Sequence, residues 1–170
     1  EIQIAMRGLS LLKVGGIMAY STCTFNPIEN EAVVSELLRR CGDSVKIIKC
    51  KLDGFKCGEG ISSWPVYDDE LKEWTLDDLS EAIANEKKMK HRYSMKKDQT
   101  FKRPPILPTM FPTGQKKLSR CLRIFPHYNN TGGFFVCLLK KVKPLKQPKR
   151  RNSQQMVSST TTTKYKQNIE

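Results

Sequence analysis

The chain has 170 residues, of which 38% are hydrophobic, and a formal net charge of +13 at pH 7. This length allows one domain with a hydrophobic core. The charge favours a polyanionic partner, nucleic acid first and an acidic membrane surface second, although solvated tails explain part of it. No apolar run approaches the ~20 residues that a transmembrane helix needs, so no membrane-spanning segment is predicted.

The six cysteines form no CxxC pair and no regular framework, which favours a reduced, intracellular protein. Zinc is a weak alternative, because neither His91 nor His127 lies at ligand spacing from a cysteine pair. We therefore predict no metal site. The chain begins with Glu1 inside an apparent helix, so we expect a fragment of a longer protein.

The first part of the chain predicts helix, strand, helix. Residues 2–13 carry an apolar stripe at helical spacing, with Gly15 as its expected end. The next apolar run, Ile17–Tyr20, reads as a short strand buried on both faces. Such alternation is typical of an α/β fold.

A second helix is expected to begin at Asn26–Glu29. Here Asn26 is the expected cap, Pro27 fits the first helical position, and Glu29 completes a capping box. Cys23 then lies between the carboxyl end of a strand and a helix N-terminus, at the edge where open α/β sheets bind ligands.

Residues 45–50 alternate apolar and basic side chains and predict a second strand. Residues 51–65 are irregular and read as a loop, in which Trp64 is expected to be a core residue, with base stacking as the alternative. A helix is expected over residues 76–90, with acidic side chains in its first turn. It leads into a basic run, residues 87–103, which favours either phosphate contact or a solvated insertion.

The rest of the chain predicts an extended proline-rich segment at 104–112 and two strands, 121–125 and 134–139, joined by a long glycine-containing loop. The core pattern ends at Val142, and residues 143–170 form a polar tail expected to be disordered. Within it, the basic stretch Lys146–Arg151 is typical of a nuclear localisation signal, and a solvated tail is an equal alternative.

Residues 20–34, Tyr-Ser-Thr-Cys-Thr-Phe-Asn-Pro-Ile-Glu-Asn-Glu-Ala-Val-Val, closely resemble a signature of the RNA (cytosine-5)-methyltransferases of the Nop/Sun family. The pair of strands at 121–139, with Arg-Ile-Phe-Pro-His and Thr-Gly-Gly-Phe-Phe, resembles the family's closing hairpin. Leu-Pro-Thr-Met-Phe-Pro at 107–112 is similar to the eukaryotic branch that methylates tRNA. Together they cover roughly residues 1 to 142.

The resemblance implies the C-terminal part of a Rossmann-like, S-adenosylmethionine-dependent methyltransferase domain that ends in an antiparallel hairpin. Residues 1–142 would form this part, with the basic insertion at about 87–103 and the tail at 143–170. It implies Cys23 as the covalent nucleophile, and a cysteine just before a helix N-terminus is expected to ionise readily. A buried, inert cysteine is the alternative that the matched motif outweighs.

The family's second cysteine lies in a Pro-Cys motif, and its cofactor is held by a glycine-rich loop on earlier strands. Neither occurs here, so no cofactor-binding residue is predicted in this chain, and S-adenosylmethionine is expected to bind upstream of it. The isolated chain is therefore expected to be inactive. A basic RNA-binding or scaffold module descended from such an enzyme is the alternative function.

RNA, and tRNA in particular, is the partner that the resemblance implies, without a membrane or a metal. The candidate RNA contacts are basic side chains of the insertion and of the closing hairpin: Lys87, Lys88, Lys90, Arg92, Arg123 and His127. Arg123 and His127 match family positions, and a role in loop structure is the alternative for both. An intracellular location is expected, in the nucleus or nucleolus, with the cytoplasm or mitochondrion as alternatives.

Overall fold

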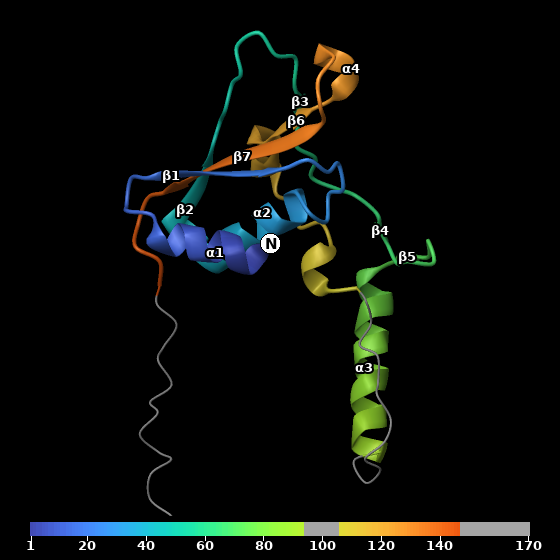
Figure 1. The fold of residues 1–170 in the computed structure, drawn as a ribbon. Coiled ribbons are helices and arrows are strands. Elements are labelled where there is room, and N and C mark those ends of the chain that lie inside the picture. The colour runs from blue at the N-terminus through green and yellow to red at the C-terminus, as the bar shows by residue number, and fades with distance from the viewer. Residues whose placement is uncertain (94–105, 147–170) are drawn as a thin grey trace, which may run out of the picture.

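A computed structural model describes residues 1–93 and 106–146, and for residues 86–93 it describes the backbone only. It is a mixed α/β structure with one main sheet (Figure 1). The helices and strands are α1 (Ile2–Leu11), β1 (Ile17–Thr22), α2 (Glu31–Cys41), β2 (Val45–Ile48), β3 (Gly58–Glu59), β4 (Val66–Tyr67), β5 (Glu73–Trp74), α3 (Leu76–Tyr93), β6 (Leu122–Ile124), α4 (Pro126–Asn129) and β7 (Phe134–Lys141). Short 3-10 turns lie at Gly42–Ser44, Pro108–Met110 and Lys116–Arg120.

The long strand β7 is the centre of the main sheet. One edge of β7 pairs with β1, and its other edge is shared by β6 and β2. All three partners run antiparallel to β7, so β1 and β2 are parallel to each other and α2 is the crossover between them. This confirms the α/β alternation, the second strand and the closing antiparallel pair predicted from the sequence.

The core lies between this sheet and the two helices that cover one of its faces, α1 and α2 (Figure 1). Phe135, Cys137 and Leu139 alternate along β7 and are fully buried against these helices. A lysine completes this layer: Lys141 at the end of β7 donates from Nζ to the carbonyls of Leu9 and Leu12, the unpaired end of α1.

The expectation that residues 17–20 form a strand buried on both faces is wrong. Alternate residues of β1 are exposed, and Ile17 is 51% exposed. The reason is that α1 and α2 cover one face of the sheet, so the side chains of β1 that point the other way stay accessible (Figure 1). Within the described residues, β1 also pairs with a strand along one edge only.

The expected start of the second helix is also wrong. Residues 27–30 form a turn, α2 begins at Glu31, and Glu29 makes no capping box. Asn26 caps this turn instead, since its Oδ1 accepts from the backbone N–H of Ile28 (3.0 Å). Cys23 therefore lies a loop away from the helix, eight residues before its first residue.

Other local predictions are confirmed. Trp64 is buried at 6% exposure and its Nε1 donates to the carbonyl of Met110, so it is a core residue. The helix after residue 75 begins with a capping box in which Thr75 and Asp78 bond each other's backbone N–H groups. In the described part of the proline-rich segment, residues 106–112, the backbone is extended at Leu107 and Phe111 and forms a 3-10 turn at Pro108–Met110 between them, so the expectation of an extended segment holds only in part.

Residues 143–146 still contact the core, because Ser44 Oγ donates to the Pro144 carbonyl and Leu145 packs against buried side chains. The tail after residue 146 lies outside the described residues. Residues 94–105, which include the rest of the basic run, lie outside them as well. Among the helices that are described, none combines the length and the apolar character that a bilayer crossing requires.

Candidate active site around Cys23

Cys23 directly follows β1, at the carboxyl end of the strand, as the sequence predicts. Its side chain is exposed. The other five cysteines are less accessible: Cys41, Cys121 and Cys137 are buried, and Cys50 and Cys57 are half-buried. Cys23 is thus the thiol that a large substrate can reach.

The buried side chain of Asn30 holds the chain on both sides of Cys23. The Thr22 hydroxyl donates to Asn30 Oδ1 (2.5 Å), and Asn30 Nδ2 donates to the Thr24 carbonyl (2.9 Å). Asn30 itself is fully buried. Since one amide bonds the residue before Cys23 and the residue after it, the position of the thiol depends on Asn30.

A tyrosine from β1 fastens the following turn to the strand. Tyr20 donates from its hydroxyl to the Glu29 carbonyl (2.5 Å), and this hydroxyl also lies 3.2 Å from Glu1 Oε2. Burial, followed by the charge of Glu1, raises the pKa of Tyr20 above its usual value. Tyr20 therefore stays a neutral hydrogen-bond donor at neutral pH.

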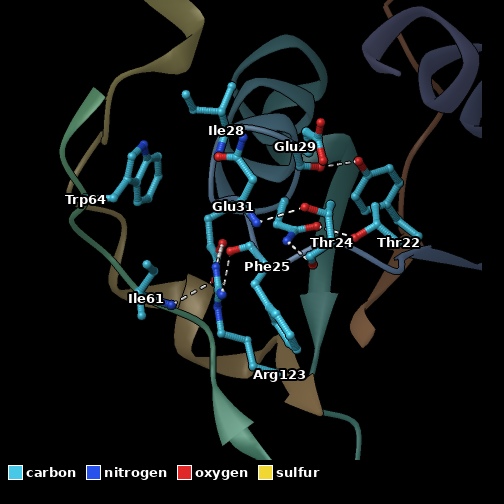
Figure 2. A network of polar contacts seen from close by, with 12 residues as sticks. Thr22, Thr24, Phe25, Ile28, Glu29, Glu31, Ile61, Trp64 and Arg123 are labelled. Carbon is cyan, nitrogen blue, oxygen red and sulfur yellow. Dashed lines mark hydrogen bonds and ion pairs between the residues drawn. The ribbon is translucent and has the colours of Figure 1, made fainter. Parts of the chain in front are cut away.

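A buried ion pair lies under the loop that carries Cys23. Arg123 on β6 forms a bidentate pair with Glu31, from Nε to Oε1 (2.7 Å) and from Nη2 to Oε2 (2.5 Å). Its Nη1 donates to the Phe25 carbonyl (3.0 Å), and Glu31 Oε1 also accepts from the backbone N–H of Ile61 (Figure 2). This network joins α2, β6, the Cys23 loop and the segment around residue 61.

The structure places the two candidate RNA contacts of the closing hairpin in different surroundings: Arg123 is buried and His127 is exposed. Arg123 is 6% exposed and its guanidinium is occupied by Glu31 and Phe25. We therefore assign it to the framework of the loop and not to an RNA-contacting surface. His127 is exposed on α4, beside Phe125 and Tyr128, and stays a candidate.

The basic residues of the insertion, Lys87, Lys88, Lys90 and Arg92, belong to the second half of α3, which extends away from the main sheet (Figure 1). Their side chains lie outside what the structure describes, as do residues 94–103. Their role as RNA contacts remains a prediction.

Asn30 and Glu31 were not predicted from the sequence as residues that support the site. Both are fully buried, and charged residues are almost never fully buried unless they are paired. The signal was present in the chain: these two polar residues directly precede the apolar run Ala32–Val34. Their partners, however, come from segments far along the chain, and a single sequence does not reveal such pairs.

A hollow of about 400 Å³ lies beside β1, between α1 and residues 18–22. Glu1 is the sole carboxylate among the residues that line it, and no glycine-rich phosphate or sugar loop adjoins it. These residues do not fit a nucleoside cofactor, so we assign no cofactor site to this hollow. Among all the described residues of the chain, no three or more His, Cys, Asp or Glu side chains lie close enough together to hold a metal ion.

Replacing Asn30 by alanine is expected to lower the free energy of unfolding by about 1–3 kcal/mol, because the Thr24 carbonyl and the Thr22 hydroxyl lose their partner. Urea unfolding measures this loss. Hydrogen exchange of residues 22–26 is expected to quicken more than that of β7. Asn30→Asp places a fully buried carboxylate against the Thr24 carbonyl, so it is expected to cost at least as much as Asn30→Ala. Unchanged exchange in both variants would contradict the assignment.

Comparison with known proteins gives consistent matches. Residues 2–140 match the sequence profile of a family described as 16S rRNA methyltransferase RsmB/F. A multisite-specific tRNA:(cytosine-C(5))-methyltransferase of Saccharomyces cerevisiae is 39% identical over 145 residues, which are 84% of this chain and 18% of the yeast protein. The protein trm4b of Schizosaccharomyces pombe, described in the same words, is 37% identical over 152 residues, 85% of this chain and 19% of the relative.

Among solved structures, a methyltransferase homologue from Pyrococcus horikoshii matches with a TM-score of 0.47 and 20% identity, over 82% of this chain and 29% of that one. The chain thus spans about a fifth of the length of the curated relatives named above.

Proposed function

The chain belongs to the RsmB/F family of RNA methyltransferases, and we propose that it supplies the catalytic cysteine for methylation of cytosine at carbon 5 in RNA. The observation that carries the proposal is the placement of Cys23. It is an exposed thiol at the carboxyl end of β1, in a loop that Asn30 holds from both sides. An inert structural cysteine would instead be buried, as Cys121 and Cys137 are.

The proposed chemistry requires a thiolate because carbon 5 of cytosine is a poor nucleophile. Addition of the Cys23 sulfur to carbon 6 opens the 5,6 double bond and places its electron pair on carbon 5, which then forms a bond to the incoming methyl group. S-adenosylmethionine supplies that methyl group when it is bound. Loss of the carbon-5 proton to a base then restores the double bond and expels the sulfur of Cys23.

We further propose that the substrate is tRNA. The two fungal relatives are named as tRNA methyltransferases, and the net charge of +13 suits an RNA backbone. A nuclear or nucleolar location is part of the same proposal, and it rests on the basic stretch at 146–151.

A non-catalytic RNA-binding module is the second candidate function. It is favoured by one observation: the lining of the hollow beside β1 does not fit a nucleoside cofactor. The two functions differ in whether Cys23 ever bonds to RNA, and one experiment separates them.

RNA that contains 5-azacytosine traps the covalent adduct, because nitrogen at position 5 carries no proton to lose. With the complete protein and S-adenosylmethionine, we expect a complex that survives denaturation, and digestion followed by mass spectrometry should locate the RNA on the peptide that contains residue 23. Adduct formation at another cysteine would overturn the role of Cys23. Absence of any adduct under conditions where the RNA binds would favour the non-catalytic module.

A further inference from the structure

Aromatic side chains gather beside the loop that carries Cys23. Phe25, two residues after Cys23, stacks on Phe125 with ring centroids 5.5 Å apart and an interplanar angle of 24°. On α4, Tyr128 packs edge-on against Phe125 (5.4 Å) and against His127 (4.4 Å). Scattered exposed apolar residues are ordinary on a protein surface, but these four rings contact one another. We call Phe25, Phe125, His127 and Tyr128 the aromatic platform.

The platform stays open to solvent although its rings are large. Phe25 is 40% exposed and Tyr128 is 38% exposed. No described element covers them, and they lie at the same end of β1 as Cys23. The connection that carries Tyr128 joins β6 and β7 at the end of β7 that pairs with Thr22, the residue before Cys23.

The rings are held in place from below by glycines and by an asparagine. A Cβ at Gly133 would lie 2.2 Å from Phe25 Cζ, and one at Gly58 would lie 2.6 Å from Phe125 Cε2, so the rings rest directly on bare backbone. Asn129 anchors α4, since it accepts from the backbone N–H of Lys56 (2.9 Å) and donates to the Lys56 carbonyl (2.8 Å). Pre-organised rings lose little conformational freedom when a ligand stacks on them.

A positive charge borders the platform. Lys56 Nζ lies over one face of the Tyr128 ring, 4.4 Å from the ring centroid, which leaves the opposite face for a stacked base. The combination of accessible ring faces and an adjacent ammonium group complements a ligand that has both flat apolar bases and phosphates. An apolar peptide or a second copy of this chain would use the rings but not the charge.

We propose that the aromatic platform stacks unpaired nucleobases of the RNA that flank the base reached by Cys23, with Phe25 and Tyr128 as the stacking residues and Lys56 as a phosphate contact. This inference rests on the proposed function for its RNA substrate. When the flanking bases stack on the protein rings, they no longer stack on the target base. The target base is then free to turn toward the thiol.

The test measures binding of the complete protein to a short single-stranded RNA, without a methyl donor, and to the same RNA with abasic nucleotides beside the target cytosine. Replacing Tyr128 by alanine is expected to weaken binding of the intact RNA about 5- to 100-fold, the usual range for one stacked base. Tyr128→Phe, which keeps the ring, is expected to bind as the unchanged protein does. The abasic RNA should bind the unchanged protein at least as weakly as intact RNA binds Tyr128→Ala, because it loses stacking on Phe25 as well as on Tyr128.

The matched control is Tyr67→Ala. Tyr67 is 46% exposed on β4, outside the platform, and its loss is expected to leave affinity unchanged. Lys56→Ala should make the slope of log affinity against log salt concentration shallower, by about the contribution of one phosphate contact. Equal weakening of intact and abasic RNA by Tyr128→Ala, or failure of Tyr128→Phe to preserve binding, would overturn the proposal.

The outcomes also separate this inference from the proposed function. Adduct formation at Cys23 together with unchanged binding by Tyr128→Ala would reject the platform and leave the catalytic role intact. Base-dependent binding through Tyr128 without an adduct at Cys23 would retain the platform on a non-catalytic module. Self-association abolished by Tyr128→Ala, with no change in RNA affinity, would identify a second copy as the occupant.

Discussion

Replacing Cys23 by alanine in the complete protein is expected to reduce methylation of RNA by roughly four orders of magnitude or more, as removal of a covalent nucleophile does. RNA affinity should change little, because Cys23 is exposed and the substitution removes a single sulfur atom. Transfer of a labelled methyl group to RNA measures the first quantity, and filter binding measures the second.

The matched controls are Cys50→Ala and Cys57→Ala, two half-buried cysteines outside the loop that follows β1. Both variants are expected to keep nearly full activity. Two of the buried cysteines are disfavoured as thiolates: burial raises the pKa of the Cys41 thiol, and the contact with Cys121 and burial raise the pKa of the Cys137 thiol. Methylation that persists in Cys23→Ala at a rate above one hundredth of normal would contradict the assignment.

The sequence predicted the order of the elements well because the signals for them are local. The apolar stripe of α1, the alternation in β2 and the capping pair at the start of α3 each lie within a few residues. The start of α2 was misplaced because residues 26–29 satisfy the rules for a helix cap and a turn equally. Tertiary contacts, such as the bond from Tyr20 to the Glu29 carbonyl, favour the turn.

The position of the candidate nucleophile was predictable, whereas its supporting residues were not. Cys23 ends a strand, and this is visible in the neighbouring residues. Arg123 was a candidate for RNA contact or for loop structure because it matches a family position, and the sequence did not reveal its partner Glu31, which lies 92 positions away. Burial of a charge depends on such distant partners, which residue type and local spacing do not encode.

The ion pair between Arg123 and Glu31 leads to the second large effect. Arg123→Ala is expected to lower the free energy of unfolding by about 3–5 kcal/mol, because it leaves a carboxylate with no exposed surface uncompensated. It also removes the donor to the Phe25 carbonyl. The loop at 23–25 should therefore lose order, in addition to the general loss of stability. Urea unfolding and hydrogen exchange measure these two quantities.

A matched control comes from α2, where Arg39 pairs with Glu36 at 2.6 Å but keeps 66% of its side chain exposed. Arg39→Ala is expected to destabilise the fold much less than Arg123→Ala, because Arg39 is largely exposed and the buried Glu36 keeps its second partner, Arg40. A double variant, Glu31→Leu with Arg123→Leu, removes both charges and is expected to recover part of the stability lost in Arg123→Ala. If Arg123→Ala costs no more than Arg39→Ala, the pair does not stabilise the fold. In that case RNA contact, which the position of Arg123 in the closing hairpin first suggested, would be the better interpretation of this residue.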